Sequence, residues 1–282
     1  MIFKLLRIKQ WIKNFFIFGA LIFSFNFTNS EKLIDSIIAF FLFCFISSSV
    51  YILNDLVDIE KDKLHPKKRN RPLASGMIKP KTAIIIMVVL ILISLIGSFA
   101  FNKSITMVLI LYFINNILYS FWIKNLVILD VMSIAIGFIL RVVTGGLAID
   151  VELSPWIILC TLFISLFLGF EKRNAEKRVL EEDSSSHRAS LQNYTQDMLD
   201  QFITISSTCT LIFYALYTVL VHEDSPFYLT NIFVVYGLFR YKYLVSVRNE
   251  GGSPADAVLG DRSIIFTVLL WIISCIIIFM NF

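Results

Sequence analysis

Long apolar stretches alternate with short polar segments along the whole chain. Each apolar stretch is close to the ~20 residues that an α-helix needs to cross a hydrocarbon core about 30 Å thick. We therefore predict an all-α integral membrane protein with nine transmembrane helices. The predicted spans are residues 14–30, 33–53, 82–101, 104–123, 126–149, 153–170, 199–221, 227–247 and 263–282.

The composition supports this fold class. Hydrophobic residues make up 57% of the 282 residues and charged residues 16%, whereas a soluble domain typically carries about 25% charged residues. We expect a single transmembrane domain over residues 1–282. No nucleic-acid partner is expected, and a homo-oligomer is left open.

The basic residues predict the orientation in the membrane. Of the 25 Lys and Arg residues, 22 fall at the N-terminus, in alternate connections or between the last two spans, which places them on one side of a bilayer. Lys and Arg are enriched on the cytoplasmic side. We therefore expect a multi-pass protein of the cell inner (plasma) membrane, with its N-terminus in the cytoplasm and its C-terminus outside. Two long cytoplasmic loops, 54–81 and 171–198, are rich in charge and are expected to carry the active site.

The first of these loops begins with an acidic stretch, NDLVDIEKD. If the preceding helix continues through it, Asn54, Asp58 and Asp62 recur at every fourth residue, and Asp55 lies on the same face. Like charges on one helix face repel, so a cation is expected among them. Ligands that are all oxygen select a hard ion, Mg²⁺ or Mn²⁺. Mg²⁺ is usually held by one or two carboxylates together with substrate phosphates.

A basic run, HPKKRNRP, follows directly. Arg69 and Arg71 offer forked donors that match phosphate oxygens, and Lys67 adds a point charge. The alternative is a solvated loop whose basic residues only mark the cytoplasmic side. The acidic stretch calls for a metal ion and the basic run calls for phosphate. Together they favour a metal–diphosphate as the ligand.

The stretch NDLVDIEKD, followed by R.RP.ASG, resembles the first aspartate-rich motif of the UbiA superfamily of intramembrane prenyltransferases. The resemblance implies a UbiA-like bundle of nine helices whose active site faces the cytoplasm. It also implies that Asn54, Asp58 and Asp62 bind a diphosphate through Mg²⁺.

The second charged loop departs from the common pattern of that superfamily, in which two aspartates four residues apart form a second acidic motif. Here the corresponding stretch reads GFEKRNAEKR, where Glu171 and Glu176 flank Lys172 and Arg173. A net basic stretch favours phosphate over a second magnesium ion. This stretch resembles the decaprenyl-phosphate phosphoribosyltransferases, and so do the segments RIKQWIKN (7–14), YSFWIKNLVILDVMSIAIGFILRVVTGG (119–146), RASLQNYT (188–195) and LGDRSI (259–264).

This second resemblance implies transfer of 5-phosphoribose from 5-phosphoribosyl 1-diphosphate to a polyprenyl phosphate such as decaprenyl phosphate, with release of diphosphate. The product would be a precursor for arabinofuranose-type glycans of the cell envelope. Positive charge develops on the sugar ring, and Asp55, Asp58 and Asp130 are the carboxylates expected at the reacting centre. The phosphate groups need partners as well. The candidates for phosphate contacts are Lys13, Lys67, Arg69, Arg71, Tyr119, Lys124, Arg141, Lys172, Arg173 and Glu176.

Several alternatives stay open at this point. Asp130 and Arg141 lie inside the fifth span, where a charge is costly unless it is paired or faces a wet cavity, so each also fits a structural pairing with another helix. Tyr119 fits a membrane-interface aromatic as well as a phosphate contact. The first functional alternative is UbiA-type transfer of a prenyl group to an aromatic acceptor. The second is a cation-coupled transporter, for which intramembrane acids would be expected near the bilayer midplane.

Overall fold

The computed structural model describes residues 2–64, 68–182, 191, 193–248 and 254–281. These residues form helices joined by turns, and they contain no β-strand. They divide into two compact units, of which the first comprises Met1–Ser133 and Leu140–Glu152 and the second Ile134–Ile139 and Leu153–Phe282. The single domain over residues 1–282 stays a prediction.

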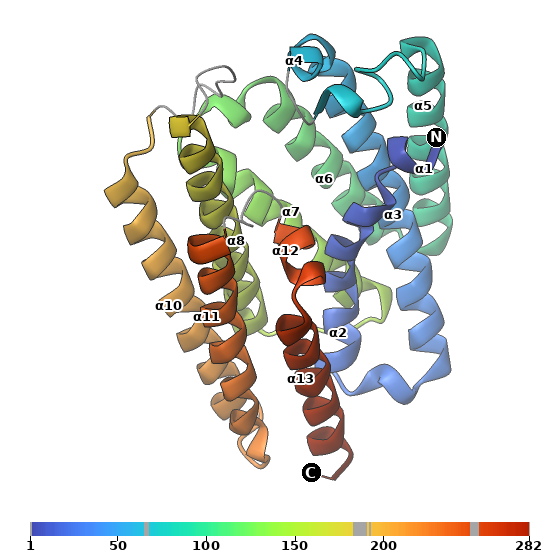
Figure 1. Cartoon of the computed structure of the whole chain (residues 1–282). Coiled ribbons are helices and arrows are strands. Elements are labelled where there is room, and N and C mark those ends of the chain that lie inside the picture. The colour runs from blue at the N-terminus through green and yellow to red at the C-terminus, as the bar shows by residue number, and fades with distance from the viewer. Residues whose placement is uncertain (1, 65–67, 183–190, 192, 249–253, 282) are drawn as a thin grey trace. The chain divides into compact units, whose positions relative to one another are not determined.

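The long helix α3 is the centre of the first unit, where it packs against α5 and α6 (Figure 1). The N-terminal elements lie along α3 as well. The elements of this unit are α1 (Ile2–Leu5), η1 (Ile8–Ile17), α2 (Phe18–Phe23), η2 (Asn26–Thr28), α3 (Ser30–Val57), α4 (Ile59–Leu64), η3 (Lys68–Asn70), α5 (Pro80–Phe101), α6 (Lys103–Phe121), η4 (Ile123–Asn125) and most of α7 (Leu129–Ala148).

The second unit is organised around two helix pairs. Helix α8 packs against α10, and α11 packs against α13. The elements of this unit are α8 (Pro155–Glu182), α10 (Gln196–Leu220), η5 (Pro226–Thr230), α11 (Asn231–Arg248), α12 (Pro254–Gly260) and α13 (Arg262–Asn281).

Within the described residues, seven helices are long and apolar enough to cross a membrane, namely α3, α5, α6, α7, α8, α10 and α13. They coincide with seven of the nine predicted spans, which supports a multi-pass membrane protein. The predicted span 14–30 is instead divided among η1, α2 and η2, with Phe25 in the left-handed backbone region at φ 61°. The predicted span 227–247 falls on η5 and on α11, whose 18 residues include three basic ones. These two segments remain predictions as spans.

The acidic stretch lies at the C-terminal end of α3. The helix begins with a cap, because the Asn29 side chain accepts hydrogen bonds from the backbone N–H groups of Glu31 and Lys32 at 3.0 and 3.2 Å. It ends at Val57 with Asp58 as its C-cap, and α4 begins at Ile59. The helix is thus interrupted within NDLVDIEKD, but Asp58 N–H still bonds Asn54 O and Asp62 N–H still bonds Asp58 O. The predicted i, i+4 spacing of these three residues is therefore kept across the break.

A buried apolar cluster fixes two distant segments against this end of α3. Leu5 comes two residues before Arg7, and Leu73 comes two residues after Arg71. Burying both leucines in one cluster brings both arginines to the same helix end. The members of the cluster are Leu5, Ile52, Leu73, Ile78, Ala83 and Leu90.

The N-terminal segment is held in a strained conformation at Arg7. This residue has φ 50° and ψ 48°, a left-handed backbone that costs a non-glycine residue about 1–3 kcal/mol. Polar contacts to α3 hold the segment on both sides of the strained residue. Ser48 Oγ donates to the carbonyl of Leu6 at 2.9 Å, and Trp11 Nε1 donates to Ser48 Oγ at 3.0 Å. The strain persists because the surrounding packing over-determines it.

A close backbone contact joins η1 to α7 at Gly145. A Cβ atom built there would lie 2.0 Å from the carbonyl oxygen of Ile17. We therefore expect Gly145→Ala to lower stability by about 1–3 kcal/mol, as overpacking does. Gly237→Ala is the matched control, because a Cβ there meets nothing within 4 Å and helix propensity favours Ala over Gly by about 1 kcal/mol. Thermal unfolding of the detergent-purified variants checks this, and equal midpoints for the two would contradict the contact.

Candidate active site

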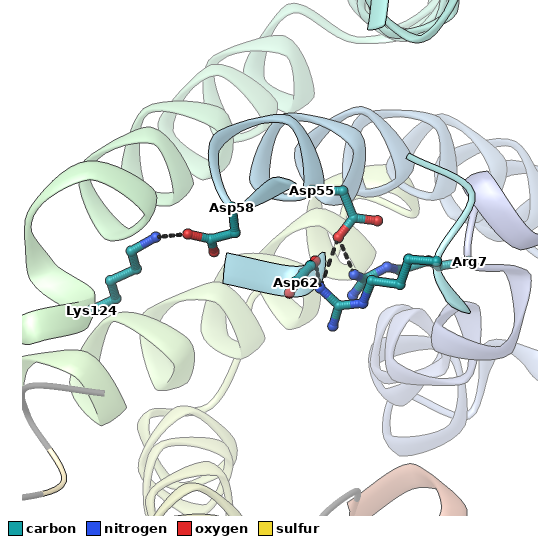
Figure 2. A network of polar contacts seen from close by, with 6 residues as sticks. Arg7, Asp55, Asp58, Asp62 and Lys124 are labelled. Carbon is teal, nitrogen blue, oxygen red and sulfur yellow. Dashed lines mark hydrogen bonds and ion pairs between the residues drawn. The ribbon is translucent and has the colours of Figure 1, made fainter. Parts of the chain in front are cut away.

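Asp55 is enclosed by two arginines at the C-terminal end of α3. Its side chain is 2% exposed, and its Oδ1 forms an ion pair with Arg7 and another, at 3.1 Å, with Arg71. Arg71 Nη1 also contacts Asp62 Oδ2 at 2.5 Å. Figure 2 shows Arg7 reaching Asp55 from the N-terminal segment, with Asp62 close by on α4. The four side chains form a continuous chain of charges, in the order Arg7, Asp55, Arg71, Asp62.

Asp58 has a separate basic partner. Lys124, which lies in η4 after α6, places its Nζ 2.7 Å from Asp58 Oδ1 (Figure 2). The lysine is buried and the aspartate is partly exposed. A buried ammonium is costly without a charged partner, so this pair orders both side chains.

Acids and bases are equal in number among the six described side chains that contact one another here. Three carboxylates, Asp55, Asp58 and Asp62, contact three basic groups, Arg7, Arg71 and Lys124. In the part of the chain that the structure describes, no three His, Cys, Asp or Glu side chains lie together as a ready-made metal site. The carboxylates of the cluster are therefore already paired with basic side chains. A metal ion that binds them has to displace those side chains.

The side-chain oxygen of Asn54 stands out in this region. Within the described residues, Asn54 Oδ1 is buried and accepts no hydrogen bond. Such an unsatisfied acceptor costs about 1–3 kcal/mol, and it calls for a partner that arrives with a ligand. Asn54, Asp58 and Asp62 offer neutral and anionic oxygens at successive turns, which is a donor set suited to Mg²⁺ when phosphate oxygens complete the shell. The residues present therefore fit a magnesium–phosphate ligand.

The other predicted phosphate contacts of the first unit differ in their exposure. Arg69 is exposed, and Lys13 and Tyr119 are partly exposed. Lys67 falls outside the described residues. Asp130 is fully buried in the first turn of α7. Roles for these residues at the reaction centre remain predictions.

Arg141 is held by uncharged and aromatic partners. Its Nε donates to Asn14 Oδ1 at 2.8 Å, and its Nη2 donates to the hydroxyl of Tyr112 at 3.0 Å. The guanidinium carbon also lies 5.0 Å from the ring centres of Phe43 and Tyr112. These contacts favour the structural alternative, in which a buried arginine ties η1 to α6 and α7. A phosphate contact by Arg141 remains a prediction.

In the second unit, the predicted basic residues share one turn of α8. Arg173 is fully buried and contacts Glu176 at 2.6 Å, and Lys172 lies 3.8 Å from the same carboxylate. The buried Glu171 carboxylate lies 2.9 Å from the Lys242 ammonium on α11. Both glutamates of GFEKRNAEKR are thus next to basic groups.

Sequence reasoning missed two of these basic groups, Arg7 and Lys242. Each lies far along the chain from the carboxylate that it meets: Arg7 is 48 residues from Asp55, and Lys242 is 71 residues from Glu171. A signal for Arg7 was present, because a carboxylate inside an apolar helix requires a cation and Arg7 heads the RIKQWIKN segment. Nothing in the sequence pointed to Lys242.

The described residues form an all-helical, multi-pass membrane protein in which carboxylates and basic side chains contact each other at one helix end. Residues 15–259 match the UbiA prenyltransferase family, and the chain belongs to this family.

Two curated relatives share one name. The chain is 32% identical over 283 residues to a decaprenyl-phosphate phosphoribosyltransferase of Corynebacterium glutamicum, covering 95% of this chain and 83% of that protein. It is 30% identical over 284 residues to the protein of the same name from Mycolicibacterium smegmatis, covering 95% and 89%. Among solved structures, a UbiA homolog from Archaeoglobus fulgidus bound to GPP and Mg²⁺ superposes with a TM-score of 0.73 at 17% identity, covering 99% of each chain. This last likeness shows that the fold is shared.

Proposed function

We propose that this protein transfers 5-phosphoribose from 5-phosphoribosyl 1-diphosphate to a polyprenyl phosphate, releasing diphosphate. The structural observation that carries the proposal is the balanced cluster at the end of α3. Oxygens suited to a metal ion lie there beside basic side chains suited to phosphate. The substrate class rests on the two relatives named decaprenyl-phosphate phosphoribosyltransferase, which align with 95% of this chain. The basic turn of α8 supports it further, because a donor and an acceptor that both carry phosphate require more cations than one diphosphate does.

Asn54, Asp58 and Asp62 are the residues that would hold Mg²⁺, with Mn²⁺ as a substitute. The Archaeoglobus fulgidus homolog of the same fold has Mg²⁺ and GPP bound together, which supports a metal–diphosphate as the ligand of this cluster. When bound, the metal would supply charge neutralisation of the departing diphosphate.

The chain's own side chains supply the remaining contacts. Lys124 contacts Asp58, and Arg71 contacts Asp55 and Asp62. When the ligand enters, both bases turn their donors to diphosphate oxygens. Lys13, Arg69 and Tyr119 in the first unit remain predicted phosphate contacts. Lys172 and Arg173 in the second unit remain predicted phosphate contacts as well. The lipid phosphate is already an anion, so the attack on the ribose carbon requires no strong general base. Catalysis then rests on positioning and charge stabilisation.

The two candidate carboxylates for the cationic sugar ring differ in their surroundings. Asp55 already contacts two guanidinium groups and is almost fully buried. We therefore assign Asp55 to the positioning of those groups. Asp130, fully buried in the first turn of α7, remains the candidate for stabilising positive charge on the ring.

The membrane arrangement follows from the sequence. We propose nine spans in the plasma membrane, with the N-terminus and the cluster at the cytoplasmic face and the C-terminus outside. Water-soluble phosphoribosyl diphosphate then reaches the cluster from the cytoplasm, while the polyprenyl tail stays in the bilayer. The product is a lipid-linked phosphoribose suited to arabinofuranose-type glycan synthesis for the cell envelope.

The rival is transfer of a prenyl group to an aromatic acceptor, which the GPP-bound homolog of the same fold favours. Two parallel reactions of the purified protein separate the possibilities. One contains ribose-labelled phosphoribosyl diphosphate and polyprenyl phosphate, and the other contains a labelled prenyl diphosphate and an aromatic acid. We expect ribose label in the lipid phase only when polyprenyl phosphate is present. Consumption of the prenyl donor alone would favour the rival.

A further inference from the structure

Arg7 is fixed against α3 from two directions. Its guanidinium forms an ion pair with Asp55 and lies 5.3 Å from the ring centre of Tyr51, one helical turn earlier on α3. Its left-handed backbone turns the chain sharply between the buried Leu5 and η1. The strained backbone conformation of Arg7 therefore accompanies the contact between its guanidinium and the Asp55 carboxylate.

The carboxylate that Arg7 meets is shared with Arg71. Asp55 is 2% exposed, whereas the Arg7 and Arg71 side chains are 21% and 26% exposed. The buried Asp55 carboxylate is thus the common partner, or anchor, of two guanidinium groups whose side chains are partly exposed. Arg71 has a second carboxylate, Asp62, at 2.5 Å.

Ligand binding would change the partners of Arg71. Asp62 is one of the oxygens assigned to the metal, so a bound metal removes Asp62 from Arg71 and leaves Asp55 as its only carboxylate in the chain of four charges. Without Arg7, the Asp55 carboxylate would bind Arg71 through both of its oxygens. With Arg7 on the same oxygen, part of the negative charge is already neutralised, and the free N–H groups of Arg71 remain available to phosphate.

We propose that Arg7 is a positioning residue: it orients Asp55 so that Arg71 can exchange Asp62 for the diphosphate of the donor. The inference rests on the proposed function for the identity of the donor. It requires an arginine at this position, because the broad guanidinium lies over the Tyr51 ring and donates to Asp55 at the same time, whereas the single ammonium of a lysine is a compact point charge.

The first test measures binding without catalysis. Isothermal titration of the detergent-purified full-length protein with inorganic diphosphate and Mg²⁺ gives a dissociation constant for each variant. We expect Arg7→Gln to raise it about tenfold, the loss of roughly one charge-assisted hydrogen bond. Lys9→Gln removes a positive charge from an exposed neighbour and is the matched control, with a change of less than about twofold, as for a screened surface charge. Equal constants for the two variants would overturn the proposal.

The second test asks whether Arg7 acts through Asp55. Asp55→Asn should also weaken binding, and the double variant Arg7→Gln/Asp55→Asn should be no weaker than the more damaging single change, because both remove the same anchor. In steady-state transfer, the KM for phosphoribosyl diphosphate should rise with the dissociation constant while kcat changes by less than about threefold, the pattern of lost binding energy. Fully multiplicative effects would overturn the proposal.

A conservative variant covers the case in which Arg7→Gln does not fold. Arg7→Lys keeps the charge but loses the guanidinium that contacts Tyr51 and Asp55 together, so its dissociation constant should lie between those of the wild type and Arg7→Gln, at about threefold above wild type. A wild-type constant would contradict the need for arginine. If the wild type binds Mg²⁺ with diphosphate but transfers no phosphoribose, the proposed function fails while the role of Arg7 stands.

Discussion

Asp58→Asn is expected to lower the transfer rate by at least about 10²–10³-fold, the effect of removing one preorganised electrostatic group from an active site. Asp58 is assigned as a metal ligand, and it also holds the buried ammonium of Lys124 at 2.7 Å. An amide keeps the size of the side chain but loses the charge on which both roles depend. Initial rates of label transfer into lipid, measured at saturating Mg²⁺, give the effect.

The control for this variant is Glu60→Gln, two residues away. Glu60 is 83% exposed and pairs with Lys63 one turn along the helix, an arrangement worth about 0.5 kcal/mol or less. Its neutralisation should leave the rate within about twofold of wild type. Retention of activity in a folded Asp58→Asn protein would remove the metal ligand from the account. Size-exclusion and thermal unfolding profiles identify a variant that has merely unfolded.

Removal of divalent cations is expected to abolish transfer, and Mg²⁺ is expected to bind appreciably only together with diphosphate. The reason is the balance of three acids and three bases at the end of α3. A bare divalent ion would add two positive charges to this cluster while displacing Arg71 or Lys124, whereas a diphosphate brings the negative charge that those side chains require.

Chelation followed by metal addition checks this prediction. Activity lost in chelator should return with Mg²⁺ or Mn²⁺. Calorimetric titration should show Mg²⁺ binding at least about a hundredfold more tightly in the presence of inorganic diphosphate than in its absence, a difference of about 2.7 kcal/mol. Full transfer in excess chelator, or equal metal affinity with and without diphosphate, would contradict the balanced-cluster account.

The helices of this protein were largely predictable from its sequence. The apolar stretches of α5 and α13 are mostly exposed, so only a lipid environment accounts for them, and hydropathy detects such segments directly. The pattern failed to predict the breaks inside apolar segments. Nothing in residues 14–30 signals the left-handed Phe25, because Phe rarely adopts that conformation and tertiary packing imposes it here.

The site was predictable in its residue types and less so in its contacts. The spacing of Asn54, Asp58 and Asp62 and the basic run after them were visible in the sequence, and the structure keeps that spacing across the break at Asp58. Pairings over long distances in the chain were not visible, such as Lys124 with Asp58 across 66 residues. They depend on where the packing of Leu5 and Leu73 and the turn after α6 bring the chain, and one sequence does not encode that as a local pattern.

In the proposed reaction, the group transferred is the phosphoribose of the donor and not a prenyl group. The most direct measurement uses two preparations of phosphoribosyl diphosphate, one labelled in the ribose and the other in the β-phosphate, each incubated with the purified protein, Mg²⁺ and polyprenyl phosphate. We predict that the ribose label enters the lipid phase and that the β-phosphate label stays in water as diphosphate, in equal amounts. Ribose label remaining in water, while the polyprenyl phosphate is unchanged, would contradict the account.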